Sequence, residues 1–346
     1  MKKKRILALF LAAVSCLSLA VSASAASATT RKATDFKDYD RTAWYAEAVS
    51  AAVDNGLLYG KSSTIIDPNG DMTRAEMAAI INRSFGCYKQ ADISQYKDVA
   101  KSKWYYKDVG LAVQMGTYNG RSSSTMAPDA PISRQEAMTV VARALELDYD
   151  SYSKTDLSAF TDRSEISNWA LPYVRAMVGA DYIHGRGKIL APQDNITRAE
   201  FAQIFANIIK NYINVKGEYV KDHDGNLLVR CTDVTLKDMT IKGDLIIGCG
   251  AADGKVTLDN VTVTGRLLVW GGGTKAVYCN NGTQMPEVVV ARVDDAVKVI
   301  YDRDSTLAVI DTIKTRITER AKQNKETEII FYDVIGLREA QKQVNA

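Results

Sequence analysis

The sequence has few of the residues on which most enzyme active sites depend. Only two histidines, His184 and His223, occur in 346 residues, and neither stands in a recognisable motif. Two are too few for most zinc sites or Ser-His-Asp triads, so we expect both on the surface or in loops. Four cysteines follow residue 25, with a spacing that fits no zinc pattern: Cys87, Cys231, Cys249 and Cys279. We expect small buried side chains there rather than disulfides, and no metal or cofactor.

The chain also lacks a strong charge excess and, beyond its beginning, any long hydrophobic run. Lysine and arginine number 44 and aspartate and glutamate 41, for a formal net charge of +3. Four of the basic residues and none of the acidic ones lie in the first 25 positions, so the remaining chain is close to −1. With no basic excess, nucleic acid is excluded as a partner. No later segment is apolar and long enough to span a membrane.

The first 25 residues have the order of a secretory signal peptide. Lys2 to Arg5 are basic, an apolar run follows from Ile6 to about Ala20, and Ala23-Ser24-Ala25 offers small residues for cleavage. This pattern predicts export and removal of residues 1–25. Cys16 raises the alternative of a lipoprotein, but the residues before it match a lipidation site poorly.

Three copies of one unit occupy the N-terminal half. A Phe/Tyr-x-Asp element, a tryptophan and a Thr/Ser-Arg-x-Glu box recur in the same order, and the box arginine steps by 60 and then 64 residues. The elements are 36–38, 96–98 and 160–162; Trp44, Trp104 and Trp169; and 73–76, 133–136 and 197–200. We place a linker at 26–35 and the repeats at 36–83, 96–143 and 160–209.

Each copy is predicted to fold as helix, loop and helix. The first helix is expected to end at Gly56 and Gly116 in copies 1 and 2, where a left-handed residue is needed. Copy 3 has Asp181 there, which tolerates that conformation less well and indicates a local distortion. The second helix starts at a capping box, in which a Thr or Ser and a Glu bond each other's backbone amides. The boxes pair Thr73 with Glu76, Ser133 with Glu136, and Thr197 with Glu200.

These landmarks resemble the S-layer homology family, whose signature is an ITRAE-like box. The matching segments are 72–76, 132–136 and 196–200, the second with Ser for Thr and Gln for Ala. The resemblance covers about residues 36 to 209. It implies a pseudo-threefold domain of three repeats that binds secondary cell-wall polysaccharide linked to peptidoglycan. It also implies that this polysaccharide often ends in a pyruvylated, hence anionic, sugar.

The box itself offers a chemistry for binding an anion. A helix N-terminus carries unpaired amides and partial positive charge, and an arginine beside it can bind a carboxylate through two hydrogen bonds. A tryptophan face can stack on a sugar ring, and a glycine lets backbone amides approach. The candidate ligands for the wall polysaccharide are Arg74, Arg134, Arg198, Trp44, Trp104, Trp169, Gly60, Gly120 and Gly185.

Structural roles compete with binding at several of these positions. The tryptophans are as well explained as core anchors, and the box Thr and Glu as caps alone. Asp38, Asp98 and Asp162 are expected to cap the first helix or to pair with an arginine, with contact to sugar hydroxyls as the alternative.

After Tyr212 the helical spacing gives way to alternation. Residues 234–247 match 256–269 at a shift of 22, and a weaker third copy starts near Val277. This period resembles short right-handed parallel β-helix modules of secreted bacterial proteins, which places a β-solenoid at 215–315; a β-sandwich stays open. Residues 316–346 are expected to cap it, with a helix at 316–327, a strand at 328–332 and a helix at 337–344.

The fold class is therefore a multidomain α plus β protein. We predict a non-enzymatic cell-surface protein, anchored non-covalently to the wall by its repeats and displaying a structural or interaction module. The rival is a wall-tethered polysaccharide lyase or hydrolase with the β-domain as catalyst. Clustered acidic and basic residues in a groove of that domain would favour the rival, and Thr, Asn and apolar residues would favour the first hypothesis.

Overall fold

The computed structural model describes residues 31–85, 89–251, 254–271, 277–293, 295–309, 312–325, 327–332 and 339–343. The predicted signal peptide and Cys87 lie outside them. Residues from Arg31 onward form one compact unit. Among the described residues, none of the helices combines the length and the apolar character that a membrane crossing needs.

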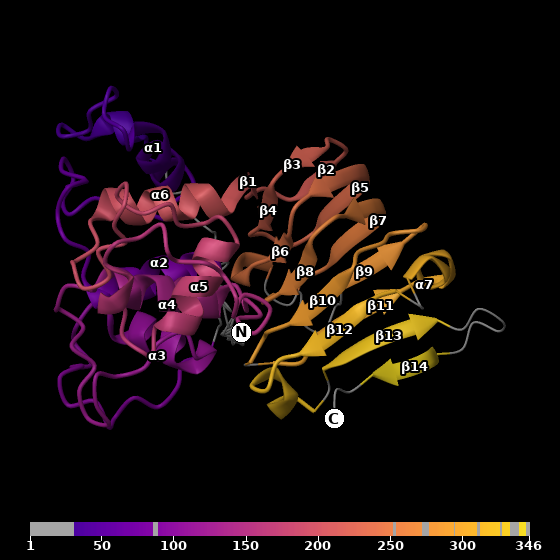
Figure 1. The fold of residues 1–346 in the computed structure, drawn as a ribbon. Helices are drawn as coiled ribbons and strands as arrows, with labels where there is room; N and C mark the ends of the chain where they lie inside the picture. The colour runs from indigo at the N-terminus through magenta and orange to yellow at the C-terminus, as the bar shows by residue number, and fades with distance from the viewer. Residues whose placement is uncertain are drawn as a thin grey trace, which may run out of the picture. The chain divides into compact units, whose positions relative to one another are not determined.

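The N-terminal half contains three helix pairs, one in each repeat (Figure 1). They are α1 (Ala46–Asp54) with α2 (Arg74–Ser84), α3 (Tyr106–Met115) with α4 (Arg134–Ala144), and α5 (Leu171–Gly179) with α6 (Arg198–Ile208). Two short 3-10 turns, η1 (Ala33–Asp35) and η2 (Arg163–Glu165), lie before α1 and α5. The predicted capping boxes are confirmed at the starts of α2, α4 and α6. The helix–loop–helix unit is thus real in all three copies.

The first helix of every pair ends in a left-handed residue. Gly56 and Gly116 have φ of 64° and 76°, as predicted. Asp181 takes the same conformation, with φ of 62°. The prediction of a distortion in copy 3 is therefore wrong. An aspartate can occupy the left-handed region at modest cost, and α5 ends as α1 and α3 do.

The three repeats close into a ring through the residue before each capping box. Met72 N–H donates to Ile196 O, Ile132 N–H to Met72 O, and Ile196 N–H to Ile132 O, each at 3.0 Å. All three side chains are fully buried. Each first helix packs on the second helix of the preceding repeat, α3 on α2, α5 on α4 and α1 on α6. Each repeat therefore depends on both others for its core.

The C-terminal half consists of two sheets of mostly parallel strands, and β1 begins directly after α6 (Figure 1). One sheet has the order β1 (Ile209–Ile213), β4 (Asn226–Val229), β6 (Leu245–Ile247), β8 (Arg266–Val269), β10 (Glu287–Val290) and β12 (Lys314–Ile317). The other has β2 (Gly217–Tyr219), β5 (Val234–Lys242), β7 (Val256–Val263), β9 (Val277–Asn280), β11 (Lys298–Tyr301), β13 (Glu328–Tyr332) and β14 (Glu339–Gln343), with β3 (His223–Asp224) beside β5. From β4 to β13 successive strands alternate between the two sheets.

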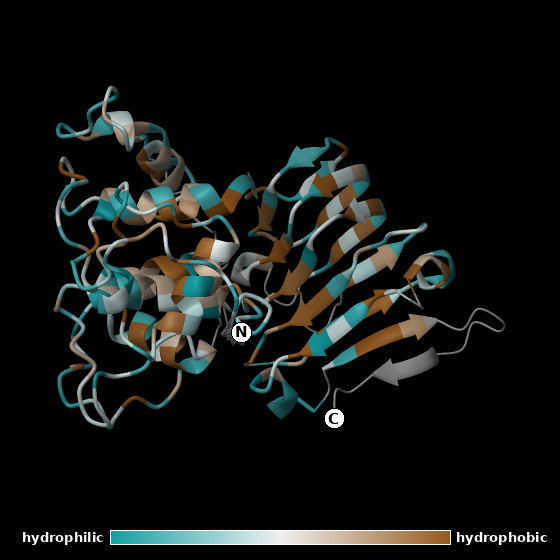
Figure 2. Ribbon diagram, in the orientation of Figure 1, coloured by the Kyte–Doolittle hydropathy of each residue, from teal (hydrophilic) through white to brown (hydrophobic). Residues whose placement is uncertain are grey.

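The duplicated segments lie side by side in the register that the sequence predicts. Val234 pairs with Val256 and Leu245 with Leu267, both at the shift of 22. Val256 pairs in turn with Val277, where the third copy was expected. Hydrophobic and hydrophilic residues alternate along β5 and β7 (Figure 2), so one face of each strand contributes to the core between the sheets.

The expectations for the last residues are wrong in part. Residues 316–327 were expected to be helical, but β12 and a 3-10 turn, η4 (Ala321–Gln323), occupy this region. The predicted helix at 337–344 is replaced by β14, which pairs antiparallel with β13. The strand at 328–332 is confirmed as β13. Two elements were not anticipated, α7 (Arg303–Val309) and η3 (Cys249–Ala251).

Candidate binding grooves between the repeats

The recurring aspartate organises the loop between the two helices of each repeat. The Asp38 carboxylate accepts hydrogen bonds from Ile66 N–H at 2.9 Å and Asp67 N–H at 2.7 Å. Asp98 and Asp162 make the same pair of bonds in their own repeats. The second amide always belongs to a non-glycine residue with φ of 50° to 54°. The expected roles as helix cap or arginine partner are wrong, because both carboxylate oxygens hold this strained turn.

The recurring glycine makes room for the aromatic ring that begins each repeat. A Cβ on Gly60 would lie 2.4 Å from the Phe36 ring and 2.5 Å from Ser62 O. Gly120 faces the Tyr96 ring and Gly185 the Phe160 ring in the same way. The absence of a side chain therefore serves close packing at this point, and it also leaves the backbone open on the groove side.

The box arginines cross from one repeat to the next. Arg74 donates through Nε to Met126 O at 2.9 Å and forms an ion pair with Glu136 at 2.8 Å. Arg134 reaches Glu200 in the third repeat, and Arg198 returns to Glu76 in the first. The three side chains are only 2% to 4% exposed. They are therefore structural links between repeats, and Arg74 and Arg134 also line grooves.

Each capping-box glutamate lies between two cations, one of which the sequence analysis missed. Besides the buried arginine, Glu76 pairs with Lys61 at 2.7 Å, Glu136 with Arg121 at 3.5 Å, and Glu200 with Arg186 at 2.6 Å. The second cation always follows the recurring glycine directly, so the pattern Gly-Lys/Arg could have identified it. One glutamate therefore faces two cations in each repeat; at Glu200 the second cation, Arg186, also pairs with Asp194 at 2.7 Å, which balances the charge there.

The pKa shifts at the Glu200 site keep its ion pairs charged at neutral pH. Burial lowers the pKa of the Arg134 guanidinium, and the charge of Glu200 opposes that shift. Burial alone would raise the pKa of Glu200, but hydrogen bonds from Arg186 and from the Thr197 amide hold it below its ordinary value. The pKa of Arg186 is raised, chiefly by its hydrogen bond to Glu200. All three side chains are therefore charged at neutral pH.

The three recurring tryptophans are exposed, so they are not core anchors. Their exposed fractions are 63% for Trp44, 60% for Trp104 and 52% for Trp169. The indoles of Trp44 and Trp104 rest edge-on against the buried Tyr45 and Tyr105 rings, at 5.5 and 5.3 Å between centroids. The neighbouring tyrosine holds the indole while its faces stay accessible.

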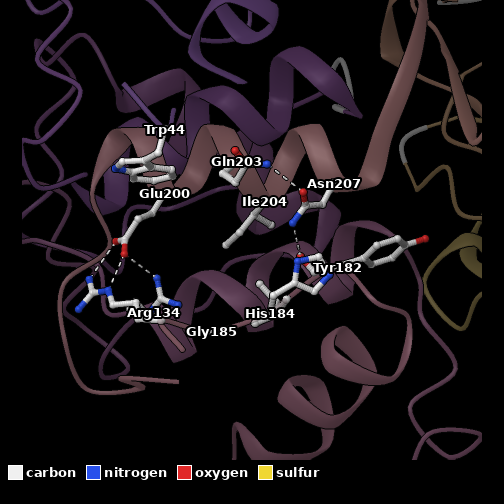
Figure 3. A pocket seen from close by; sticks show the side chains of 11 residues that line it. Trp44, Arg134, Tyr182, His184, Gly185, Glu200, Gln203, Ile204 and Asn207 are labelled. Carbon is white, nitrogen blue, oxygen red and sulfur yellow. Dashed lines mark hydrogen bonds and ion pairs between the residues drawn. The ribbon is translucent and has the colours of Figure 1, made fainter. Parts of the chain in front are cut away.

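Two grooves bring these residues together, each lined by all three repeats. The groove in Figure 3 has a volume of about 370 Å³ and takes Trp44 from repeat 1, Arg134 from repeat 2, and Gly185, Arg186 and Glu200 from repeat 3. Figure 3 shows Trp44 across the opening from the His184–Gly185 segment, with the Arg134–Glu200 pair toward one end. The second groove, of about 430 Å³, has the corresponding set: Trp169, Arg74, Gly120, Arg121 and Glu136.

The third set of predicted residues has a different local arrangement. Arg198, Glu76 and Lys61 form the same ion pairs. Here the Arg83 guanidinium lies 3.8 Å from the centroid of the Tyr59 ring and donates to Leu57 O. The counterpart of Arg83 in the second groove is Arg143, which lines that cavity and lies 4.9 Å from the Tyr173 ring.

Three interlocked helix pairs with matched landmarks define a repeat protein of three structurally equivalent units, with grooves at two of the junctions. Comparison with known families identifies the repeats. The S-layer homology domain model matches residues 35–78, 95–138 and 159–202, so these three segments are S-layer homology repeats. The N-terminal half of the protein thus carries repeats that relatives named as surface-layer proteins also contain.

Curated relatives share part of the chain. The surface-layer 125 kDa protein of Lysinibacillus sphaericus is 33% identical over 184 residues, which are 52% of this chain and 15% of that protein. The cellulosome-anchoring protein of Acetivibrio thermocellus is 29% identical over 151 residues, 42% of this chain and 33% of the relative. The amylopullulanase of Thermoanaerobacterium thermosulfurigenes is 27% identical over 187 residues, 51% and 10% of the two chains. The chain therefore spans a third or less of the length of these relatives.

Proposed function

We propose that the protein holds itself non-covalently on the wall by binding an anionic, peptidoglycan-linked polysaccharide in the grooves between its repeats. The observation that carries this proposal is the recurring set of one glutamate between two cations, opposite an exposed tryptophan. A pyruvylated terminal sugar matches it, because its carboxylate can pair with the exposed cation while its ring stacks on the indole. Relatives named for the surface layer and for cellulosome anchoring support the same role.

Within a groove, the two cations have different tasks. The buried arginine fixes the glutamate and lines the wall; three of the five N–H groups of Arg74 are bonded to Glu136, Met126 O and Asn119 O. The exposed cation is the more accessible carboxylate ligand, since the side chains of Arg121 and Arg186 are 46% and 37% exposed; a ligand at Arg186 would share it with Asp194, which pairs with it at 2.7 Å. We therefore place the anion beside Lys61, Arg121 or Arg186.

The C-terminal half is proposed to be a parallel β-solenoid that serves as a structural or interaction module and not as a catalyst. Its alternating strands and the register of 22 residues support the solenoid. A cavity of about 340 Å³ in this half is lined by Thr262, Val263, Gln284, Met285, Pro286, Ala308, Val309 and Thr312. Threonine, glutamine and apolar residues favour this reading over a lyase or hydrolase, which would need paired carboxylates or metal ligands.

Wall binding tests the proposal. We expect Lys61→Gln/Arg121→Gln/Arg186→Gln to lose sedimentation with purified walls, because each of the three sets of ion pairs loses its exposed cation. The matched control Lys216→Gln/Lys221→Gln/Lys325→Gln removes the same charge from exposed positions in the C-terminal half and should bind as wild type does. Walls stripped of polysaccharide should bind none of the three proteins. Equal binding by both variants would contradict the grooves as the site, and sugar release from wall glycans would favour the rival enzyme.

A further inference from the structure

A second cavity lies directly beside the groove of Figure 3, on the other side of Trp44. It has a volume of about 580 Å³, between α1 and α6. Trp44 and Gln203 line both cavities. We propose that this cavity, which we call the α1–α6 cleft, binds the next sugars of the polysaccharide whose terminal unit occupies the groove. This inference rests on the proposed function and extends it from a terminal sugar to a longer stretch of chain.

The lining of the α1–α6 cleft suits an uncharged or mixed sugar segment. Small side chains form a shallow apolar surface: Ala43, Ala46, Ala48, Ala51 and Ala206. Polar and charged groups complete the lining: Arg41, Glu47, Asn55, Lys210 and Tyr212. A pyranose ring has an apolar face and a belt of hydroxyls, so it can lie on the alanines while its edge bonds these groups. The volume lies within the roughly 300–1,000 Å³ of ordinary ligand pockets.

The other two repeats show why the cleft is particular to this junction. The positions of Ala48 and Ala206 correspond to Asp108 and Asn82 at the α2–α3 junction. There the Asn82 amide donates to Asp108 O at 2.8 Å and to its carboxylate at 3.2 Å, which bridges the two helices. At the α4–α5 junction, Tyr173 replaces Ala48 and lies against Arg143 and Tyr149. Larger side chains thus occupy the space that alanines leave open beside Trp44.

Continuity with the groove identifies the occupant. Trp44 forms a common wall, and its indole is 63% exposed, so its two faces can contact successive sugars. The Gln203 side chain lies at the same boundary and donates to Asn207 Oδ1 at 2.9 Å within the groove. A polymer that enters the groove by its terminal sugar can therefore continue past Trp44 without leaving the surface.

Calorimetry with size-fractionated oligosaccharides from purified wall polysaccharide, all retaining the same terminal sugar, tests the inference. We expect wild type to bind four-sugar fragments about tenfold tighter than the shortest fragment. Ala51→Leu/Ala206→Asn introduces the neutral side chains of the α2–α3 junction, Leu111 and Asn82, into the cleft; it should keep the affinity for the shortest fragment and lose the gain with length. Ala51→Leu alone gives a second filled cleft should the double variant fail to fold.

The outcomes separate the two proposals. An equal gain with length in wild type and in the filled variants overturns the cleft as the second subsite, as does the absence of any gain in wild type. In both cases the groove proposal stands as long as the shortest fragment binds. If no fragment of any length binds wild type, the proposed function and this inference fail together. Ala308→Leu, at an exposed position of α7, is the matched control and should behave as wild type does.

Discussion

At the scale of single residues, the capping-box glutamate performs three tasks. Glu136 caps its own helix by accepting from Ser133 N–H at 2.9 Å, and it joins repeat 2 to repeat 1 through Arg74. It also anchors the exposed Arg121 at the groove. The capping box is a local signal for the start of a helix. Its glutamate also joins neighbouring repeats and contributes to the charge of the groove.

Removal of one box arginine should cost stability rather than binding alone. In Arg74→Ala, the carbonyls of Met126 and Asn119 lose their donor and the partly buried Glu136 loses its buried partner. We expect a loss of roughly 3 kcal/mol in the free energy of unfolding, measured by urea denaturation. The control Arg121→Ala removes the exposed partner of the same glutamate and should cost less than about 1 kcal/mol. Equal stabilities of the two variants would contradict the structural role of Arg74.

The sequence predicted much at this scale and missed what depends on neighbours. Spacing within a repeat was enough to find the capping boxes and the left-handed helix ends at Gly56 and Gly116, because each is a local property of backbone and side chain; it left open whether the tryptophans are exposed. It could not show that Arg74 crosses into repeat 2, since an arginine in a first helical turn is ordinarily solvated. Nor could it distinguish a helix cap from a loop anchor for Asp38, whose partners lie 28 and 29 residues away.

At the scale of elements, arginines of the β half bind the C-terminal ends of the repeat helices. Arg266 donates to Leu145 O and Glu146 O after α4, and Arg320 to Val113 O and Gln114 O in the last turn of α3. Arg230 donates to Arg83 O near the end of α2. Helix C-termini carry unpaired carbonyls and partial negative charge, so cations stabilise them. The amides at the helix N-termini are not free for a ligand, contrary to the expectation from the sequence: Arg74 N–H donates to Ala130 O at 3.0 Å and Ala75 N–H to Pro128 O at 2.9 Å, and α4 and α6 begin in the same way.

Trp270 is the test of this docking, because it joins β8 to α4. Its indole is 1% exposed and donates to Ala144 O at 2.9 Å. Trp270→Ala should lower the free energy of unfolding by about 3–5 kcal/mol, through lost packing and an empty volume. Trp270→Phe keeps most of the packing but leaves the buried carbonyl without its donor, at a cost of about 1–3 kcal/mol. Thermal unfolding should rank wild type above Phe and Phe above Ala; any other order would show that the hydrogen bond or the packing is misassigned.

Strand β12 reaches into the segment for which the sequence predicted a helix, and it shows how tertiary pairing overrides a local helix preference. Residues 316–327 are charged and contain several good helix formers, which favours a helix in isolation. In the structure, Lys314 to Ile317 pair in parallel with β10, and Arg316 donates to Glu146 O in the repeats. The periodicity of so short a segment cannot indicate that the segment pairs with the edge of a sheet.

At the scale of the whole molecule, the six-stranded sheet belongs to two cores at once. Leu228, Ile246, Leu268 and Val289 join the hydrophobic core of the helical repeats. Their neighbours along the same strands, such as Leu227, Leu267 and Val288, join the core between the two sheets. Because successive residues of a strand point to opposite faces, the inner strands β4, β6, β8 and β10 are buried on both sides. The anchor and the displayed module are therefore one folded body from Arg31 onward.

Shared burial predicts that the helical and β halves unfold together. We expect one urea transition, with the same midpoint for peptides of α2 and α4 and for peptides of β6 to β10, followed by hydrogen exchange and mass spectrometry. Leu268→Ala removes a fully buried side chain from the face that packs on the repeats and should cost about 2–5 kcal/mol. If the halves are one cooperative unit, this single change lowers the midpoint in both sets of peptides by the same amount. The control Leu307→Ala, at an exposed position of α7, should move neither midpoint appreciably. A lower midpoint in the β peptides alone would show that the repeats fold independently of the module they carry.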